Sequence, residues 1–473
     1  MKYVADLHLH SKYSRAVSRD MTLPIMAEYA VKKGINILTT GDFTHPLWFR
    51  EISSQLEENG EGVYGLKTSS SAKASEGQAE LDKLKFILTV EISSIYSQGG
   101  KTRRIHSLVF APNLSVADKI NKELTKRGAN LSSDGRPIIG LSARNLLELI
   151  LSIDKKCMLI PCHAWTPWFS LYGSMSGFDS IEECFGNLSS EIYGIETGLS
   201  SDPLMNWRIK DLQSRSILSF SDSHSPMKMG REATVFDLEE VSYGNIREAI
   251  MNPTQLTGQQ KTEKLGAENR KQKTDNRISA TFEFYPEEGK YHYTGHRMCK
   301  IVQTPEETKR NGVICPVCKR NLTVGVMHRV EQLSRIKNHE SRIKNDDNGV
   351  AWHYDPDEIH PPFVKLVPLI EIISECIGSL PASQKVREVF EKLCLEFGSE
   401  VQVLLKTSIE DIEKLVGPKI SGGIKKVRSG DIEVKPGYDG EYGIVKINFS
   451  ETETSLITAT RTQPSDSQIG IDF

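Results

Sequence analysis

The sequence has 473 residues, of which 38% are hydrophobic and 26% charged, enough for roughly two to four domains around a sizeable core. No apolar run approaches the roughly 18 residues of a membrane-spanning helix, and residues 1–6 show no apolar signal region, so we expect a cytoplasmic protein with no membrane partner. The net charge is −3, yet residues 261–350 hold 18 Lys and Arg against 12 Asp and Glu, which indicates a basic appendage on an acidic body.

From residue 1 to about 255, short apolar runs alternate with stretches of helical periodicity. Repeated βα units of this kind predict an α/β fold with a parallel sheet, and their number favours a closed, distorted barrel over an open sheet. The segment 51–83 breaks this rhythm with Glu, Gly and Ser, so we expect an insertion or mobile loop there. Strands are expected at Tyr3–Asp6, Ile35–Thr40, Phe86–Val90, Ser107–Phe110, Met158–Pro161, Ile192–Glu196 and Ile217–Ser221, and helices at 23–33, 142–153 and 204–213.

The second half of the chain changes in character. A polar, basic stretch predicts a linker at 256–280, and a small metal-binding module is expected at 281–330. A helical region follows at 331–449 and ends in a β-hairpin over 431–449. Residues 450–473 are rich in Ser and Thr and are predicted to be a disordered tail.

Metal-type side chains stand where the expected strands of residues 1–255 end. In a βα barrel the carboxyl ends of all strands meet on one face, so residues far apart in sequence become neighbours. Imidazoles with a bridging carboxylate suit a cluster of divalent ions that activates water and holds a phosphoryl group. The alternative is that each histidine is an ordinary core or surface residue. This alternative explains a single histidine well, but it does not explain so many metal-type residues at strand ends. The candidates are His8, His10, Asp42, Glu91, His106, His163, Asp222 and His224.

Over residues 1–250 these motifs resemble the polymerase and histidinol phosphatase (PHP) family of metal-dependent phosphoesterases. The resemblance implies a barrel with two or three divalent ions (Zn2+, Mn2+ or Mg2+), and catalysis by His8, Glu91 and Asp222. It assigns one metal to His8, His10, Glu91 and Asp222, a second to Glu91, His106 and His163, and a third position to Asp42 and His224. At that third position the sequence departs from the family, because Ser14-Arg15-Ala16 and Phe43 stand where histidines are expected, with His45 as a substitute. Two metals are therefore the safer expectation.

Cysteine spacing predicts a structural zinc site in the module. His296-x2-Cys299 and Cys315-x2-Cys318 are two short turns that each offer two ligands to one tetrahedral ion. His292 is the alternative to His296. A closed site of this kind supplies the folding free energy of a small module and is not a second active centre.

The order of these parts, with Gly289–His296, Cys315–Cys318, Gly325–Val330 and Lys435–Gly443, resembles the endonuclease Q family up to about residue 449. The resemblance implies a DNA repair endonuclease that cuts damaged DNA on the 5′ side of deaminated bases (uracil, hypoxanthine, xanthine) and of abasic sites. One alternative is a small-molecule phosphatase of the histidinol-phosphate type, which has no use for a basic appendage. Another is a non-catalytic DNA-binding module, which would not need the retained ligands.

Two segments are candidates for contact with DNA. Aromatic side chains after His163 would stack on a flipped base, with loop packing as the alternative; they are Trp165, Trp168, Phe169 and Tyr172. Residues 402–430 read as two short helices around a Gly-containing turn and resemble a helix-hairpin-helix. In that case Lys419 and Lys425 would hold phosphates, and a plain αα-hairpin is the alternative.

The last six residues resemble the peptides that bind bacterial sliding clamps. Gln468, Ile471 and Phe473 have the spacing of a glutamine, an aliphatic residue and a terminal aromatic residue at the tip of the tail. A short extended peptide of this kind would dock in an apolar groove of the clamp. A chance match in an irregular end of the chain is the alternative.

Overall fold

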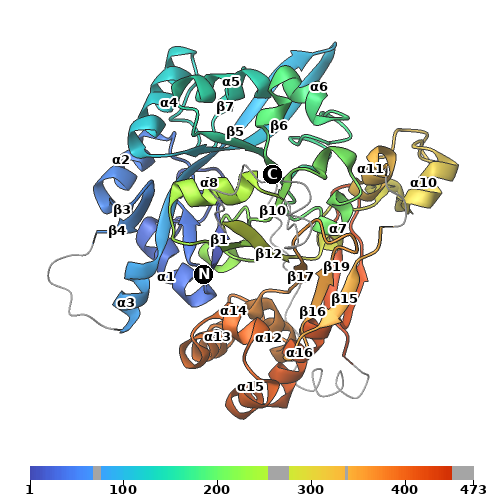
Figure 1. The fold of residues 1–473 in the computed structure, drawn as a ribbon. Helices are drawn as coiled ribbons and strands as arrows, with labels where there is room; N and C mark the ends of the chain where they lie inside the picture. The colour runs from blue at the N-terminus through green and yellow to red at the C-terminus, as the bar shows by residue number, and fades with distance from the viewer. Residues whose placement is uncertain (68–75, 254–275, 336–338, 450–473) are drawn as a thin grey trace, which may run out of the picture.

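The computed structural model describes residues 1–67, 76–253, 276–335 and 339–449. Within these residues the fold is mixed α/β, with helices packed around a large mixed sheet (Figure 1). Most of the predicted linker and all of the predicted tail, with its peptide Gln468, Ile471 and Phe473, lie outside the described residues. Among the described helices, none has both the length and the apolar character needed to cross a membrane.

The large sheet contains 13 of the described strands. Its main path runs β15-β16-β17-β12-β11-β1-β2-β5-β4-β3, and β6, β7 and β8 join it through β5 and β6. The strands of the N-terminal half are β1 (Lys2–Asp6), β2 (Ile37–Thr39), β3 (Leu56–Gly60), β4 (Val63–Leu66), β5 (Lys85–Gln98), β6 (Lys101–Ala111), β7 (Ile138–Ile139), β8 (Met158–Pro161) and β11 (Ala233–Asp237). A separate parallel pair, β9 (Gly194–Glu196) and β10 (Ser216–Leu218), lies beside them.

The expected strands are present, but the prediction of a parallel sheet is wrong for much of it. β1, β2 and β5 are parallel neighbours, whereas β5–β6, β6–β8 and β1–β11 are antiparallel. The long strands β5 and β6 are antiparallel because a tight turn joins them. The turn residues Gly99 and Gly100 have positive φ values of 61° and 72°. A two-residue turn of this type matches the twist of a hairpin and needs glycine-like freedom at both positions.

Two of the three predicted helices are confirmed, as α1 (Leu23–Lys33) and α5 (Ala143–Ile153). The Ser142 side chain caps α5 by accepting a hydrogen bond from the Asn145 amide. The third prediction, 204–213, is wrong as one helix. The structure has α7 (Pro203–Asn206) and a 3-10 turn, η2 (Lys210–Leu212), because the backbone becomes extended at Ile209.

The segment expected as an insertion or mobile loop at 51–83 contains regular structure in the residues that are described, 51–67 and 76–83. It contains the end of α2 (Pro46–Gln55), the β3–β4 hairpin and α3 (Glu76–Lys83). Tyr64 of β4 pairs with Phe86 of β5, so this hairpin forms one edge of the large sheet. Both Val63 and Tyr64 are buried, which explains why the hairpin is held despite its polar flanks.

The C-terminal half extends the same sheet and adds a helical layer. β12 (Arg277–Glu283) pairs with β11, so the start of the region expected as a small module belongs to the sheet. β15 (Arg342–Asn345), β16 (Ala351–Tyr354) and β17 (Phe363–Lys365), which the sequence did not predict, continue the sheet to its edge. The helices are α12 (Leu369–Ile377), α13 (Gln384–Phe397), α14 (Glu400–Leu405), α15 (Ile409–Val416) and α16 (Pro418–Ser429).

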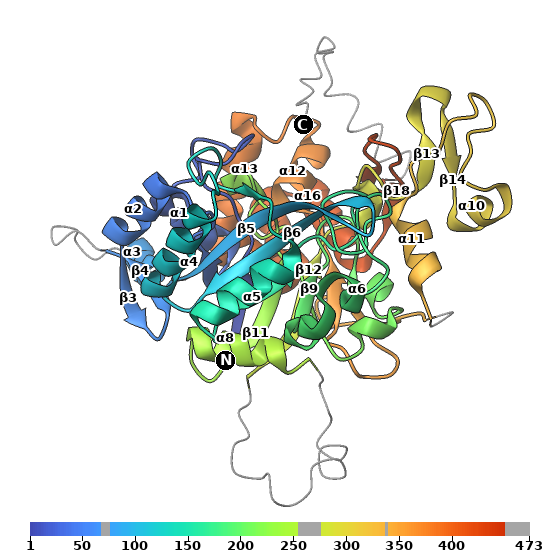
Figure 2. The same cartoon turned by 90° about the horizontal axis from the view of Figure 1, so that it is seen from above.

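A small module projects from one side of the molecule (Figure 2). It contains β13 (Thr294–His296), β14 (Ile301–Gln303), α10 (Pro305–Asn311) and α11 (Val326–Leu333). The predicted C-terminal hairpin is confirmed as β18 (Ile432–Lys435) and β19 (Ile444–Ile447). Its loop reaches the module, where Asp439 accepts hydrogen bonds from the Arg297 amide at 2.7 Å and the Thr323 hydroxyl at 2.5 Å.

Candidate metal centre at the strand ends

Six of the eight predicted ligands come together in space: four lie just beyond the carboxyl ends of strands, and two, Glu91 and His106, lie within the antiparallel pair β5–β6. His8 and His10 follow β1, Glu91 lies in β5, His106 in β6, His163 follows β8 and Asp222 follows β10. We call His8, His10, Glu91, His106, His163 and Asp222 the strand-end cluster. A parallel bridge between Leu9 and Ser223 aligns the segment of His8 and His10 with that of Asp222. Residues more than 200 positions apart are thereby fixed as neighbours.

The cluster contains two groups of ligand atoms that share one carboxylate. Atoms of His8, His10, Glu91 and Asp222 lie within 4.8 Å of one another, and so do atoms of Glu91, His106 and His163. The shared residue is Glu91, which has two carboxylate oxygens to divide between the groups. This is the arrangement that a carboxylate bridging two ions requires.

In the first group the ligand atoms converge on a common point. His10 Nε2 lies 3.0 Å from Asp222 Oδ1 and 3.3 Å from Glu91 Oε2, and His8 Nε2 lies 3.7 Å from both of these oxygens. His8 is fully buried, and its Nε2 atom has no hydrogen-bond partner. A buried ring nitrogen without a partner is costly, so the donor set fits a cation between these residues.

In the second group two imidazoles face one carboxylate oxygen. Glu91 Oε1 lies 2.5 Å from His106 Nδ1 and 3.1 Å from His163 Nε2, and the two ring nitrogens are 3.3 Å apart. A proton can satisfy only one of these contacts at a time. A divalent ion would satisfy all three atoms at once.

Carboxylates behind the first group hold its histidines in place. Glu196 binds His8 Nδ1 at 2.9 Å and 3.0 Å and also accepts a hydrogen bond from the His163 amide. Asp42 binds His10 Nδ1 at 3.1 Å. These contacts fix the ring orientation and leave Nε2 of both histidines facing the cluster, as in metal sites where a carboxylate orients a ligating histidine.

The predicted third position is arranged differently from a ligand group. Asp42 Oδ2 accepts hydrogen bonds from the Ser11 amide and hydroxyl and from the Ser14 hydroxyl. The ring of His224 lies 4.7 Å from that of His10, and its Nδ1 contacts the Asp222 carbonyl at 2.9 Å. The suggested substitute, His45, stacks on Tyr13 at 4.4 Å. Asp42 therefore lies behind His10, where it can orient the ring.

The electrostatics of the cluster keep its two carboxylates ionised and the His106 imidazole neutral, whereas the neighbouring carboxylates, against the effect of burial, raise the pKa of the histidines at positions 8, 10 and 163. Burial raises the pKa of Glu91, but the charges of His106 and Arg136 and hydrogen bonds hold it well below its usual value. Burial likewise opposes ionisation of Asp222, yet His8 and His10 keep its pKa well below the usual range. Burial lowers the pKa of His106 to about 4, against the pull of Glu91. Ionised carboxylates and a neutral imidazole are the forms that bind metals.

The backbone at this site adopts the left-handed region at three site residues that are not glycine. The φ values are 46° at Asp42, 28° at His163 and 46° at Asp222. Gly41 has a φ of 59°, and a Cβ there would lie 2.2 Å from the Leu9 carbonyl oxygen. Such conformations persist only where the surroundings enforce them, and they are concentrated at functional sites.

Sequence reasoning missed two members of this site, Glu196 and Arg136. Glu196 ends a strand that the sequence predicted, so its position at a strand end was the available signal. Arg136 comes from a loop, and its Nη1 atom lies 3.2 Å from Glu91 Oε2. Its pKa is raised, first by the charge of Glu91, so a permanent cation stands beside the shared carboxylate.

The predicted aromatic residues divide into two kinds. Trp165 and Tyr172 are fully buried and stack at 4.8 Å, and Trp165 Nε1 donates to Asn206 at 2.8 Å. This is loop packing, the alternative interpretation of these two rings. Trp168 is half-buried and contacts Tyr291 edge to face at 5.6 Å. It links the loop after His163 to the start of the projecting module.

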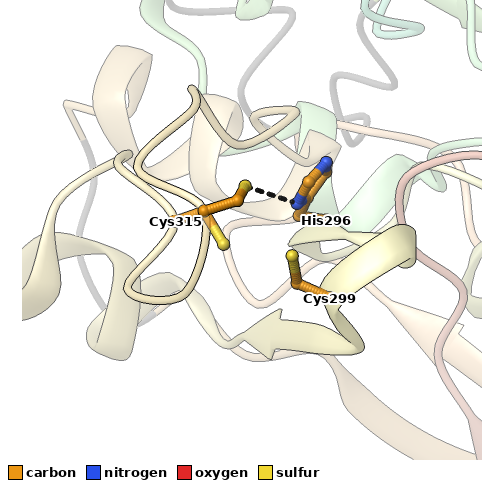
Figure 3. Close-up of side chains that lie close together, drawn as sticks. His296, Cys299 and Cys315 are labelled. Carbon is orange, nitrogen blue, oxygen red and sulfur yellow. Dashed lines mark hydrogen bonds between the residues drawn. The ribbon is translucent and has the colours of Figure 1, made fainter.

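The module carries a second, chemically different cluster, formed by His296, Cys299, Cys315 and Cys318. Its ligand atoms lie within 4.8 Å of one another, and Figure 3 shows His296, Cys299 and Cys315 pointing toward one another from separate turns. Cys318 Sγ lies 3.4 Å from His296 Nδ1. We call this the thiol cluster. The alternative ligand His292 is buried elsewhere, with Nδ1 3.1 Å from the Pro286 carbonyl.

The thiol cluster is poised to bind a cation. Desolvation would raise the pKa of Cys315, but the amides of Cys318 and Val317 lower it to about 6. A thiol in this range is largely thiolate at neutral pH, the form that binds metal. Four nitrogen and sulfur donors with no further group between them suit a closed tetrahedral site.

Comparison with known structures identifies the family. A crystal structure of the lesion-specific endonuclease PfuEndoQ from Pyrococcus furiosus is 30% identical, with a TM-score of 0.73 over 94% of this chain and 96% of that chain. A crystal structure of Endonuclease Q in complex with a 27-mer duplex carrying an abasic lesion at the active site is also 30% identical, with a TM-score of 0.74 over 96% and 98%. The chain belongs to the endonuclease Q family.

Two sequence relatives extend this endonuclease Q relationship. The protein YqxK of Bacillus subtilis (strain 168) is 28% identical over 94% of this chain and 99% of its own length. The protein MJ0043 of Methanocaldococcus jannaschii is 33% identical over 61% of this chain, but the match spans only 31% of MJ0043. The family model of the MJ0043 C-terminal domain matches residues 368–431.

In this endonuclease Q family member, residues 368–431 include the predicted helix pair. α15 and α16 pack against each other around Gly417, which has a φ of 83°. Lys425 is exposed and Lys419 is half-buried, both on α16. The two short helices expected here are present, while the resemblance to a helix-hairpin-helix and the contact with DNA stay predictions.

Proposed function

We propose that the protein is a metal-dependent DNA repair endonuclease that hydrolyses the phosphodiester on the 5′ side of deaminated bases and abasic sites. The observation that carries the proposal is the pair of ligand groups sharing Glu91 in a chain of the endonuclease Q family. One related structure is described as lesion-specific, and another holds duplex DNA with an abasic lesion at its active site. Uracil, hypoxanthine and xanthine are the deaminated bases to test.

The strand-end cluster supplies the donors that hydrolysis of a phosphodiester needs. Divalent ions bound there would provide an activated water and charge to stabilise the leaving oxygen. Glu91 would join the two ion positions, and His8 and Asp222 would complete the first. Glu196 keeps His8 Nδ1 occupied, so that only Nε2 faces the reaction. Arg136, held against Glu91, is placed to contact a non-bridging phosphate oxygen.

We also propose that the N-terminal half is a distorted PHP barrel. Hydrogen-bonded neighbours run from β11 through β1, β2, β5 and β6 to β8. The Ala164 amide then donates to the Glu196 carbonyl at 3.0 Å, which connects to β9 and β10, and the Ser219 amide donates to Thr234 Oγ1 at 3.0 Å, which leads back to β11. This circuit of contacts supports closure and explains why the strand ends share one face.

The DNA would extend from the strand ends toward the projecting module. Lys290 Nζ lies 5.7 Å from the ring centres of both Tyr291 and Tyr442, next to Trp168. Aromatic rings beside lysines suit an unstacked base and its neighbouring phosphates. Lys419 and Lys425 on α16 would add contacts to the backbone of the duplex without reading its sequence.

A small-molecule phosphatase is the less favoured function. The barrel ligands alone would serve either activity. A likeness to endonuclease Q structures over 94–96% of the chain covers the module and the C-terminal helices as well. A phosphatase of small esters would have no use for these parts.

A nicking assay tests the proposal. We would incubate duplexes that carry one uracil, one hypoxanthine or one abasic site with the full chain and Mn2+, Mg2+ or Zn2+. We expect one cut on the 5′ side of the lesion and no cut in an undamaged duplex. Release of phosphate from histidinol phosphate, without any nicking, would contradict the proposal in favour of the phosphatase.

We further propose that the last residues dock on a sliding clamp, which would raise the local concentration of the enzyme on DNA. The spacing of Gln468, Ile471 and Phe473 is the observation behind this. A fluorescent 464–473 peptide should bind the host's clamp, and an Ile471→Ala/Phe473→Ala peptide should not. Equal binding by the two peptides would contradict the idea.

A further inference from the structure

A third group of metal-type side chains lies outside both clusters already described. Ligand atoms of His339, Asp355 and Asp357 fall within 4.8 Å of one another. His339 precedes β15 and Asp355 follows β16, so the group stands at the open end of the β15–β16 hairpin. Asp355 is buried and His339 is partly buried, whereas Asp357 is exposed and closes the group toward solvent.

Hydrogen bonds within this group explain the positions of His339 and Asp355, but not the position of the Asp357 side chain. His339 Nε2 lies 3.0 Å from Asp355 Oδ1, and Asp355 also accepts hydrogen bonds from the amides of Asp357, Ile359 and His360. These contacts shape the loop, but they do not explain why the Asp357 side chain is brought to His339. Two carboxylates and an imidazole nitrogen at this spacing form a donor set for a divalent ion.

A second observation points to a missing partner. His360 is 5% exposed, and its Nε2 atom is buried with no hydrogen-bond partner. The charged groups that act on its ring are Asp355, His339 and Asp357. The His360 backbone amide donates to Asp355 Oδ2 at 3.1 Å, so a buried imidazole nitrogen without a partner belongs to a residue that is held to this group.

We propose that His339, Asp355 and Asp357 bind a divalent transition ion such as Zn2+, and that this ion is structural. It goes beyond the proposed nuclease function, because the site shares no residue with the strand-end cluster or the thiol cluster. We call it the hairpin site. The ion would hold the two ends of the β15–β16 hairpin together.

The hairpin site also bears on how the two halves of the molecule join. Trp207 belongs to the N-terminal half and is fully buried. Its ring centre lies 5.9 Å from that of His339, edge to face, and 5.9 Å from that of His360, with the planes within 6° of parallel. An ion that fixes the His339 imidazole would therefore also fix part of the packing around Trp207. The segment just before His339 is tied to the same place, since the Arg335 amide and the Ser334 hydroxyl donate to the Arg208 carbonyl.

Metal content of the full chain tests the proposal. We would measure bound zinc by mass spectrometry in the wild type, in Asp357→Asn, and in a His339→Gln/Asp357→Asn double variant. Asp347→Asn is the matched control, because Asp347 is an exposed carboxylate at the other end of the same hairpin. We expect both hairpin-site variants to lose one equivalent of zinc that Asp347→Asn retains. If the double variant fails to fold, Asp357→Asn alone decides the question, since it removes only an exposed side chain.

Cobalt substitution gives a second readout that is independent of activity. Co2+ bound by thiolates shows sulfur-to-metal charge-transfer absorption, whereas Co2+ in a nitrogen and oxygen site does not. The Asp357→Asn variant should lose part of the d–d absorption and keep the sulfur-to-metal charge-transfer bands at full strength, whereas Cys315→Ser should weaken those charge-transfer bands. Zinc content and cobalt spectra equal to those of Asp347→Asn would overturn the proposal and leave His339 and Asp355 as a hydrogen-bonded pair. Because neither readout uses DNA, failure here is distinguishable from failure of the nuclease proposal.

Discussion

The strand-end cluster and the thiol cluster gather metal-type side chains in opposite ways. The first draws on residues from His8 to Asp222, carried by separate strands, and mixes imidazoles with carboxylates. The second lies between His296 and Cys318 on two adjacent turns and relies on thiols. Buried carboxylates orient the first from behind, through Glu196 and Asp42. In the thiol cluster, backbone amides of the same turn lower the pKa of the Cys315 thiol instead.

Under the proposed function, this difference separates a site for catalysis from a site that stabilises a fold. The sheet and its hydrophobic core hold the strand-end residues in place, so that cluster should keep its shape without ions. The module buries few apolar side chains of its own, so the metal should supply much of its folding free energy. Loss of a ligand is therefore expected to remove activity in one case and structure in the other.

The largest effect is expected at the shared carboxylate and its neighbour. Glu91→Gln and Asp222→Asn should each lower the rate of nicking by about 1,000-fold or more, because several kcal/mol of transition-state stabilisation depends on the ions they hold. Binding to damaged DNA should change little. Single-turnover cleavage and gel-shift affinity on one substrate measure both. Asp20→Asn, an exposed carboxylate, is the control, and wild-type cleavage by Asp222→Asn would exclude this cluster as the active site.

A smaller effect should follow when a carboxylate behind the ligands is changed. Glu196→Gln keeps the shape of the side chain but no longer accepts the His8 Nδ1 proton as a charged group. We expect a loss of about 10- to 100-fold in metal affinity or activity, partly recovered at high metal concentration. Titration of cleavage against Mn2+ measures this, with the exposed Glu182→Gln as control. Cleavage that is lost at every metal concentration would instead place Glu196 among the ligands.

Loss of a ligand from the thiol cluster should affect the folding of the module more than the rate of cleavage. Cys315→Ser is expected to release one zinc, expose the module to protease and weaken DNA binding by roughly tenfold, about 1.4 kcal/mol. The N-terminal half should unfold at an unchanged temperature. Met298→Ala, an exposed change in the same module, is the control. Zinc content and protease resistance equal to those of the control would show that Cys315 is not a ligand.

The smallest effect on activity is expected at Glu288, a partly buried carboxyl outside both clusters. Burial, helped by Glu371, raises the pKa of Glu288 to about 7 despite Arg231 and Lys228. A raised carboxyl pKa contributes stability below the unfolded value near 4.5, and that contribution is lost as pH rises through about 7. Glu288→Gln should therefore stabilise the protein at pH 8.5, by at most about 3 kcal/mol, and have little effect at pH 4.5. Thermal unfolding at the two pH values measures this, and a stabilisation that is equal at both would contradict the assigned pKa.

The sequence predicted which metal-type side chains come together better than it predicted the sheet that holds them. A histidine or carboxylate at the end of an apolar run is a local signal, and six of these residues do converge. Strand direction is not local. The apolar runs within 86–110 predict two strands of a parallel sheet. Gly99-Gly100 lies between alternating segments, however, and is a signal for an antiparallel hairpin.

Residues that act through other residues were harder to find. Glu196 ends an expected strand, but only the contact with His8 Nδ1 shows its role. Arg136 comes from a loop whose path depends on Gly135, where a Cβ would lie 2.3 Å from Asp42 Oδ2. β15, β16 and β17 were missed because they are short and form the edge of a sheet assembled mostly from distant segments.

One experiment compares the two clusters on the same substrate. Metal-free wild type, Asp222→Asn and Cys315→Ser would be titrated with Mn2+ and assayed on a duplex with a single abasic site, at protein concentrations above the dissociation constant for DNA. The account predicts one cut 5′ of the lesion by the wild type, nearly the same maximal rate for Cys315→Ser, and no cut by Asp222→Asn at any Mn2+ concentration. Cleavage by Asp222→Asn, or an inactive but DNA-saturated Cys315→Ser, would contradict the assignment of chemistry to the strand ends.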